Sequence, residues 1–199
     1  MPLKPRQFLP AFFAVALSVC SAQETAQVKS ILKVDGWSRG PFVGQESASC
    51  LRVDSDGIAK YFHRWNPGKV KVDAKTGKKS LVELTVSVER HLTRAELFEI
   101  SGFLESDVVK ALGDGFNIPH NPIDYWESAT IHIISPDGNE KDILIRDYGE
   151  ASLEQRGQLP GALIVLMDKI EEIEKAAALK GKATKIPTDC PESLKRADP

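Results

Sequence analysis

The sequence contains few cysteines and histidines, the residues that most often bind zinc. Its 199 residues include three cysteines and four histidines. No CxxC, HxxxH or HExxH pattern occurs, so the common local zinc motifs are excluded. The glycine-rich stretch at residues 40–44 has neither the lysine nor the following helix of a phosphate-binding loop. The residues therefore indicate no metal, no cofactor and no catalytic residue, and they favour a protein that is not an enzyme.

Neither sign of charge dominates the chain. It carries 26 lysines and arginines against 28 aspartates and glutamates, which gives a formal net charge of −2 at pH 7. Nucleic-acid binding requires a concentrated basic surface, so nucleic acid is not expected as the main partner. One basic cluster follows Gly68, and we interpret it as a solvated loop. Its members are Lys69, Lys71, Lys75, Lys78 and Lys79.

Only one long apolar run is present, and it lies at the N-terminus. Residues 8–19 are almost entirely apolar and follow the basic residues Lys4 and Arg6. About a dozen apolar residues are too few to span a membrane, which takes roughly 20. Small residues follow, so the pattern predicts a signal peptide over residues 1–22, cleaved after Ala22. We therefore expect a secreted or periplasmic protein without a transmembrane span.

A lipid anchor is an alternative interpretation of the same segment. Leu17-Ser18-Val19-Cys20 resembles a bacterial lipobox, although Val19 stands where a small residue is usual. Cys20 would then be the lipidated first residue, and the protein would be an envelope-anchored structural lipoprotein.

Cys50 and Cys190 remain after removal of the signal peptide. Two cysteines in an oxidising compartment most often pair, so we predict a disulfide between them. Such a bond would tie the C-terminal tail to an early strand. The alternative is two separate thiols.

Two hairpins and a further strand are predicted. Ser49–Val53 and Ile58–Trp65 flank an Asp-Ser-Asp-Gly turn, in which glycine accepts a positive φ. Ser128–Ile134 and Lys141–Asp147 flank a second turn of the same kind. Leu81–Val88 alternates apolar and polar residues, which is typical of a half-buried strand.

Two amphipathic helices are also predicted. Thr93-Arg94-Ala95-Glu96 has capping-box spacing, and apolar residues follow at helical intervals. A second apolar stripe begins after Pro160 and ends at Lys180-Gly181. We therefore expect an α+β fold over residues 23–181. Specifically, we expect a two-layer sandwich in which two main helices pack on one face of an antiparallel sheet of about five to six strands. Residues 182–199 are expected to form a loose tail, except near Cys190.

The segment at residues 117–134 concentrates polar and aromatic side chains. His120, Asp124 and Glu127 could supply general acid–base groups if they converged on one pocket. Prolines at 119 and 122 indicate a loop, however, in which Asn and Asp bond their own backbone. We favour the loop and keep a hydrolase-like enzyme as an alternative.

Several short features resemble small bacterial domains of the emfourin type, named for an inhibitor of the metalloprotease protealysin. These are Gly40-Pro41-Phe42-Val43-Gly44, Asp124, Thr130-Ile131-His132-Ile133, Asp137-Gly138 and Pro160-Gly161-Ala162-Leu163. The resemblance covers roughly residues 28–179. It implies an α+β fold and suggests protease inhibition, and it assigns no inhibitory residue. The lysine cluster, the proline-rich insert and the cysteine-bearing tail depart from the family pattern.

Residues 37–43, which we expect to form an exposed loop within the glycine-rich stretch 36–44, are the best candidate for a binding site. It combines Trp37, Arg39 and Phe42, residue types that often carry the energy of protein interfaces. In an equally weighted alternative, Trp37 and Phe42 cap the core of the sheet. The leading hypothesis is a non-enzymatic protein-binding domain whose partner could be a protease. The sequence does not define an oligomeric state.

Overall fold

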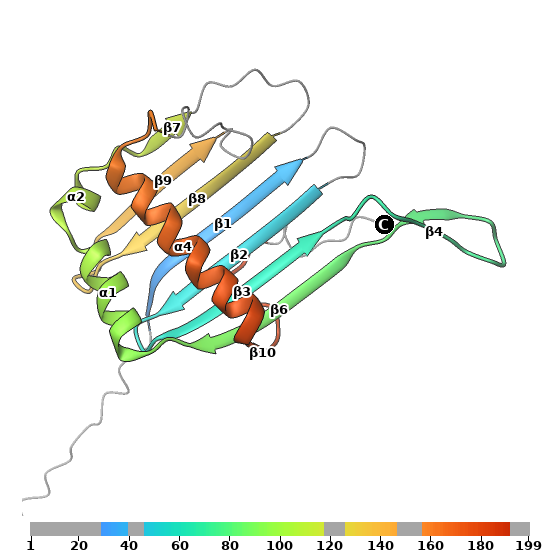
Figure 1. Ribbon diagram of the computed structural model, residues 1–199, viewed down its shortest axis with the longest axis horizontal. Helices are drawn as coiled ribbons and strands as arrows, with labels where there is room; N and C mark the ends of the chain where they lie inside the picture. Colours follow the sequence, from blue (N-terminus) through green and yellow to red (C-terminus); the bar gives the residue numbers. More distant parts are fainter. Residues whose placement is uncertain (1–28, 40–45, 118–125, 147–156, 192–199) are drawn as a thin grey trace, which may run out of the picture.

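A computed structural model describes residues 29–39, 46–117, 126–146 and 157–191 (Figure 1). The described chain is mostly β. It forms one mixed sheet of eight strands, a separate two-stranded ribbon and three helices. The expected two-layer α+β sandwich, with five to six antiparallel strands and two main helices, is therefore wrong.

The sheet contains six longer strands and two short ones. The longer strands are β1 (Ser30–Arg39), β2 (Glu46–Asp54), β3 (Ile58–Trp65), β6 (Leu84–His91), β8 (Trp126–Ile134) and β9 (Glu140–Arg146). The short strands are β7 (Gly115–Asn117) and β10 (Lys182–Ala183), and they form the two edges of the order β10-β6-β3-β2-β1-β8-β9-β7. The sheet is mixed because β7 pairs parallel to β9. Strands of two or three residues carry no periodic signal, so the sequence could not predict them.

The lysine cluster lies on the two-stranded ribbon. This ribbon consists of β4 (Val70–Val72) and β5 (Lys79–Leu81), and it projects away from the main sheet (Figure 1). Both of its strands are exposed along their whole length, in agreement with a solvated segment.

β1 includes the first residues of the segment that was expected to be a loop. Gly36 and Trp37 pair with Ser49 and Ala48 of β2, so residues 36–39 are strand rather than loop. There is no room for a side chain at Gly36, because a Cβ at this position would lie 2.6 Å from Ser49 Oγ.

The two predicted hairpins are confirmed. β2 and β3 are joined by a turn with Gly57 at φ +85°, and β8 and β9 by a turn with Gly138 at φ +85°. Both glycines occupy the left-handed region that other residues rarely adopt.

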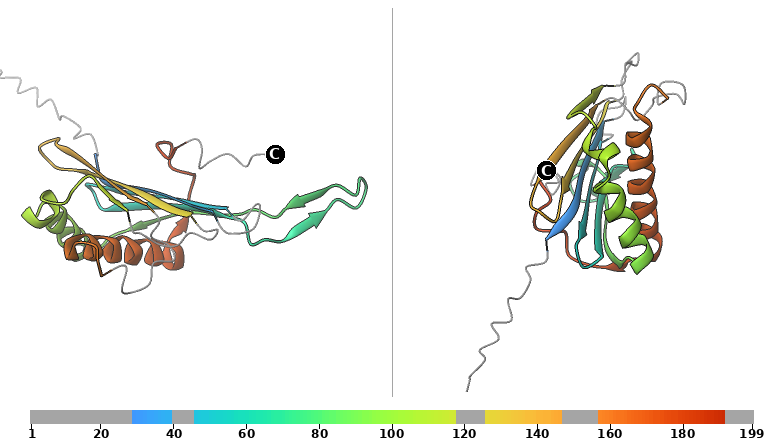
Figure 2. Two further views of the ribbon diagram at one scale, coloured as in Figure 1. Left: turned by 90° about the horizontal axis from the view of Figure 1, so that it is seen from above. Right: turned by 90° about the vertical axis from the view of Figure 1, so that its left-hand side faces the viewer.

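The three helices are α1 (Arg94–Leu104), α2 (Asp107–Lys110) and α4 (Gly161–Lys180). The predicted capping box is present at α1, since the Thr93 side chain accepts from Glu96 N and the Glu96 carboxylate accepts from Thr93 N. α1 and α4 lie on one face of the sheet, called here the inner face (Figure 2). The buried residues of α4 join the main core under the sheet, and they are Leu163, Leu166, Ile170 and Ala177.

The segment after α4 is held against the sheet as far as the described chain extends. Lys182 and Ala183 pair with β6 at the sheet edge. The chain then crosses to the other face, called here the outer face (Figure 2). There Cys190 forms a disulfide with Cys50 of β2, so the predicted bond is confirmed. Residues 182–191 therefore depart from the loose tail that was expected outside the neighbourhood of Cys190.

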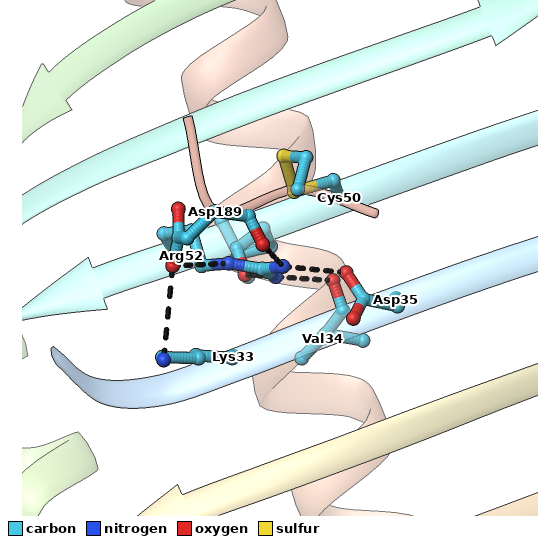
Figure 3. Close-up of a disulfide and its surroundings, with 8 residues drawn as sticks. Lys33, Val34, Asp35, Cys50, Arg52 and Asp189 are labelled. Atoms are coloured by element: carbon cyan, nitrogen blue, oxygen red, sulfur yellow. Dashed lines mark hydrogen bonds and ion pairs between the residues drawn. A yellow bond between two sulfur atoms is a disulfide. The ribbon is translucent and has the colours of Figure 1, made fainter. Parts of the chain in front are cut away.

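A buried arginine lies beside this disulfide (Figure 3). Arg52 is 3 % exposed and makes five hydrogen bonds, which matches the five N–H donors of a guanidinium. Its acceptors are the carboxylates of Asp35 (2.7 Å) and Asp189 (3.0 Å) and the backbone carbonyls of Val34, Leu51 and Asp189. Arg52 thereby joins β1, β2 and the C-terminal segment.

Within the described ranges, no helix is long and apolar enough to cross a membrane.

Replacement of both cysteines by alanine should weaken the fold. The bond closes a loop with a sequence separation of 140, so the chain-entropy model gives about 5 kcal/mol, and measured losses are about 2–5 kcal/mol. Urea unfolding under oxidising and reducing conditions measures the effect. Reductant should lower the midpoint of the natural chain and leave the double variant unchanged. Equal midpoints for the natural chain in both conditions would contradict the prediction.

Candidate functional site

Trp37 lies on the outer face of the sheet. Along β1, the residues Leu32 and Val34 point into the main core on the inner face, and Trp37 has the opposite parity. Trp37 is 39 % exposed, and Arg39 is exposed on the same side of the strand. Trp37 therefore does not cap the core between the sheet and the helices.

Cross-strand pairing brings two further arginines to this region. Trp37 pairs with Ala48 and Ser128, Ala48 pairs with Arg64, and Ser128 pairs with Arg146. Paired residues share a face, and neighbouring strands are about 4.8 Å apart. We call the surface formed by Trp37, Arg39, Arg64 and Arg146 the aromatic–basic surface.

The charges on this surface are only partly neutralised. Arg64 lies 4.0 Å from Glu83. Glu46 is the register partner of Arg39, but no ion pair joins the two. Arg39 and Arg146 have no ion-pair partner among the described residues, and both are exposed. Two guanidinium groups beside Trp37 are therefore available to a carboxylate. Phe42, the third predicted binding residue, lies outside the described residues.

A second candidate site is a pocket between the inner face and α4, with a volume of about 370 Å³. Its floor is a row of small side chains. Ala129, Gly36 and Ser49 are successive register partners on β8, β1 and β2. Larger apolar residues surround this row, and they are Val34, Ile131, Ile145, Met167 and Ile170. α4 packs on the large residues on either side of this row. The small side chains of the row do not fill the space between the sheet and α4, and this leaves the pocket. We call it the inner pocket.

Polar groups converge on the inner pocket from three elements. β3 contributes Tyr61 and His63, β8 contributes Glu127, and α4 contributes Glu171 and Glu174. Burial, with the nearby carboxylates of Glu171 and Glu127, raises the pKa of Glu174 from 4.5 to about 7. Burial lowers the pKa of His63 below its ordinary value of 6.5, so this ring is neutral at pH 7.

The residues of the predicted hydrolase site are only partly described. His120 and Asp124 lie outside the described residues. Glu127 lines the inner pocket, where its carboxylate is close enough to Glu174 to raise the pKa of that group. His132 is on the outer face, 2.5 Å from the carboxylate of Asp142 on the neighbouring strand.

One further pattern in the sequence is Gly36-Trp37-Ser38-Arg39-Gly40, which has the spacing GxSxG. In hydrolases, the serine of this pattern stands on a sharp turn between a strand and a helix. Here Ser38 is inside β1, is 9 % exposed and hydrogen-bonds Ser47 Oγ at 2.8 Å. Residues 36–39 of the pattern are part of a strand, so Ser38 does not stand on a nucleophile elbow.

The sequence analysis missed most of the inner pocket. Glu174 lies beside the apolar stripe of α4, between Ile170 and Ala177, and this position was a detectable signal. A larger open depression of about 1000 Å³ lies along the β8–β9 turn, but solvent-exposed charges line most of it. In the described part of the chain, no three His, Cys, Asp or Glu side chains are arranged to hold a metal ion.

No family model, curated protein or solved structure matches this chain. The resemblance to emfourin-type domains therefore stays a prediction.

Glu174→Gln should stabilise the protein more at pH 8 than at pH 5. Folding raises the pKa of this carboxyl, so the folded state favours its protonated form. The protonated carboxyl therefore contributes to the stability of the fold. This contribution is complete below pH 4.5 and is lost as the pH rises through about 7. Glutamine imitates the protonated form at every pH. The stability difference from the natural chain should grow by about 1–3 kcal/mol between the two pH values. Urea unfolding at each pH measures it, and an unchanged difference would contradict the assignment.

Proposed function

We propose that this chain is a protein-binding domain that acts outside the cytoplasm and captures its partner with the aromatic–basic surface. One observation carries the proposal: Trp37 is 39 % exposed on the face opposite the described helices, with exposed arginines around it. Tryptophan and arginine are among the residue types most enriched at positions that dominate interface energies.

The surroundings of the surface favour a rigid binding site. β1 is paired on both sides, with β2 and β8, so its backbone is fixed by two hydrogen-bonded ladders. The disulfide and Arg52 anchor the same two central strands on the outer face, close to Trp37. A preorganised surface loses little conformational entropy on binding, and this favours affinity.

The partner should present carboxylates around an apolar contact. Arg39 and Arg146 offer planar, bidentate donors for carboxylates, while the indole of Trp37 offers apolar area. A protease is the partner class suggested by the emfourin-type resemblance, and inhibition would follow if the surface covered the substrate cleft. Export is supported by the N-terminal pattern of residues 1–22, which lie outside the described residues, and by the disulfide.

The Trp37→Ala/Arg39→Ala double variant should lose partner binding and keep its fold. The test immobilises the full chain, exposes it to the envelope and culture fluid of the host, and identifies captured proteins by mass spectrometry. The affinity of the enriched protein is then measured for each variant. Removal of a central tryptophan typically costs at least about 2 kcal/mol, which is roughly a thirtyfold loss of affinity.

Phe98→Ala is the matched control, because Phe98 is an aromatic side chain 83 % exposed on α1, on the opposite side of the sheet. It should leave affinity and capture unchanged. Capture that survives the double variant, or that Phe98→Ala weakens equally, would remove the aromatic–basic surface from the binding site. If the captured protein is a protease, its inhibition is measured with the natural chain, the double variant and Phe98→Ala.

A further inference from the structure

The inner pocket contains a half-buried carboxyl group, that of Glu174. Glu174 points into it from α4, and no hydrogen bond or ion pair joins its carboxyl to another described residue. Glu171, on the pocket rim, is held by Lys175 at 2.8 Å. No lysine or arginine is among the described residues that line the pocket. A half-buried carboxyl facing an open space of about 370 Å³ is suited to an external cation.

The remaining walls specify what kind of cation fits. The floor and one side are apolar, formed by Ala129, Ile131, Ile145, Met167 and Ile170. The opposite side carries Tyr61, whose ring can face a cation. His63 stacks on Trp65 with ring centroids 4.9 Å apart, which fixes this wall. A bare metal ion would leave the apolar walls unused, whereas an organic ammonium uses both kinds of surface.

We propose that the inner pocket binds a small organic amine, with the ammonium group against Glu174 and Tyr61 and an apolar body over the Ala129 floor. The site is separate from the aromatic–basic surface, since the two lie on opposite faces of the sheet.

The natural chain carries its own reporter for this pocket. It contains two methionines, Met1 and Met167, and Met167 lines the inner pocket. Protein labelled with ¹³C in the methionine methyl groups therefore gives one signal from the pocket, and a second from Met1 only where residues 1–22 are retained. 2-Phenylethylamine is the probe, because its ring current should shift the Met167 signal on binding. 2-Phenylethanol, which has a hydroxyl in place of the amine, is the neutral comparison.

The amine should shift the Met167 signal in a saturable way and bind at least tenfold more tightly than the alcohol. Glu174→Gln should weaken amine binding at least tenfold and leave the alcohol unaffected. Glu172→Gln is the matched control, since it makes the same chemical change two residues earlier, at a position that does not line the pocket. It should bind the amine as the natural chain does.

The pH dependence gives a second test. An alkyl ammonium stays charged to about pH 10, whereas Glu174 ionises near pH 7. Binding should therefore strengthen severalfold from pH 6 to pH 8 in the natural chain and become flat in Glu174→Gln. The other groups facing Glu174 are Tyr61, His63, Glu127 and Glu171. Burial raises the pKa of Tyr61, which stays protonated over this range, and burial lowers the pKa of His63, which favours the neutral ring.

Three results would overturn the proposal. They are the absence of a saturable Met167 shift with the amine, equal affinity for the amine and the alcohol, and amine binding that Glu174→Gln leaves unchanged. Urea unfolding of each variant shows that it is folded, so a loss of binding is assigned to the pocket.

Discussion

The five hydrogen bonds of Arg52 constrain the rest of the structure. A guanidinium buried on a sheet is stable only if all of its donors are paired, and removal of one partner from a buried pair costs about 3–5 kcal/mol. Two of the elements that supply acceptors, β1 and the segment around Asp189, are far apart in the chain. The C-terminal segment must therefore cross to the outer face, and Cys190 is brought to Cys50 in the same step.

This crossing divides the outer face into two parts. The part over β2 and β3 is covered by a small second core, formed by Ala48, Cys50, Phe62 and Cys190. The part around Trp37 and Arg39 is left to solvent at the end of β1. On the inner face, α4 crosses a row of small residues and leaves the inner pocket beneath it. Each candidate site thus lies where packing against the sheet is incomplete. The aromatic–basic surface is on the outer face, and the inner pocket is on the inner face.

Short-range patterns predicted the local structure well. Gly57 and Gly138 fix the two hairpin turns because a tight turn needs a positive φ. Thr93 and Glu96 fix the start of α1 through reciprocal hydrogen bonds between residues three apart. The same patterns failed where pairing is supplied by distant residues. The glycine-rich stretch around Gly36 and Trp37 suggested a loop. In the structure, hydrogen bonding to β2 on one side and β8 on the other holds both residues in β1.

The sequence by itself determined the turns, the helix ends and the disulfide, because each follows from the chemistry of a few residues or from the small number of cysteines. Only the tertiary structure decided the mixed eight-stranded sheet, the exposure of Trp37 and the convergence of Glu174, Tyr61 and His63. These features depend on which strands become neighbours and which face the helices cover. Strand order depends on the apolar surface that the whole chain buries, through contacts between residues far apart in the sequence. A local sequence pattern does not contain this information.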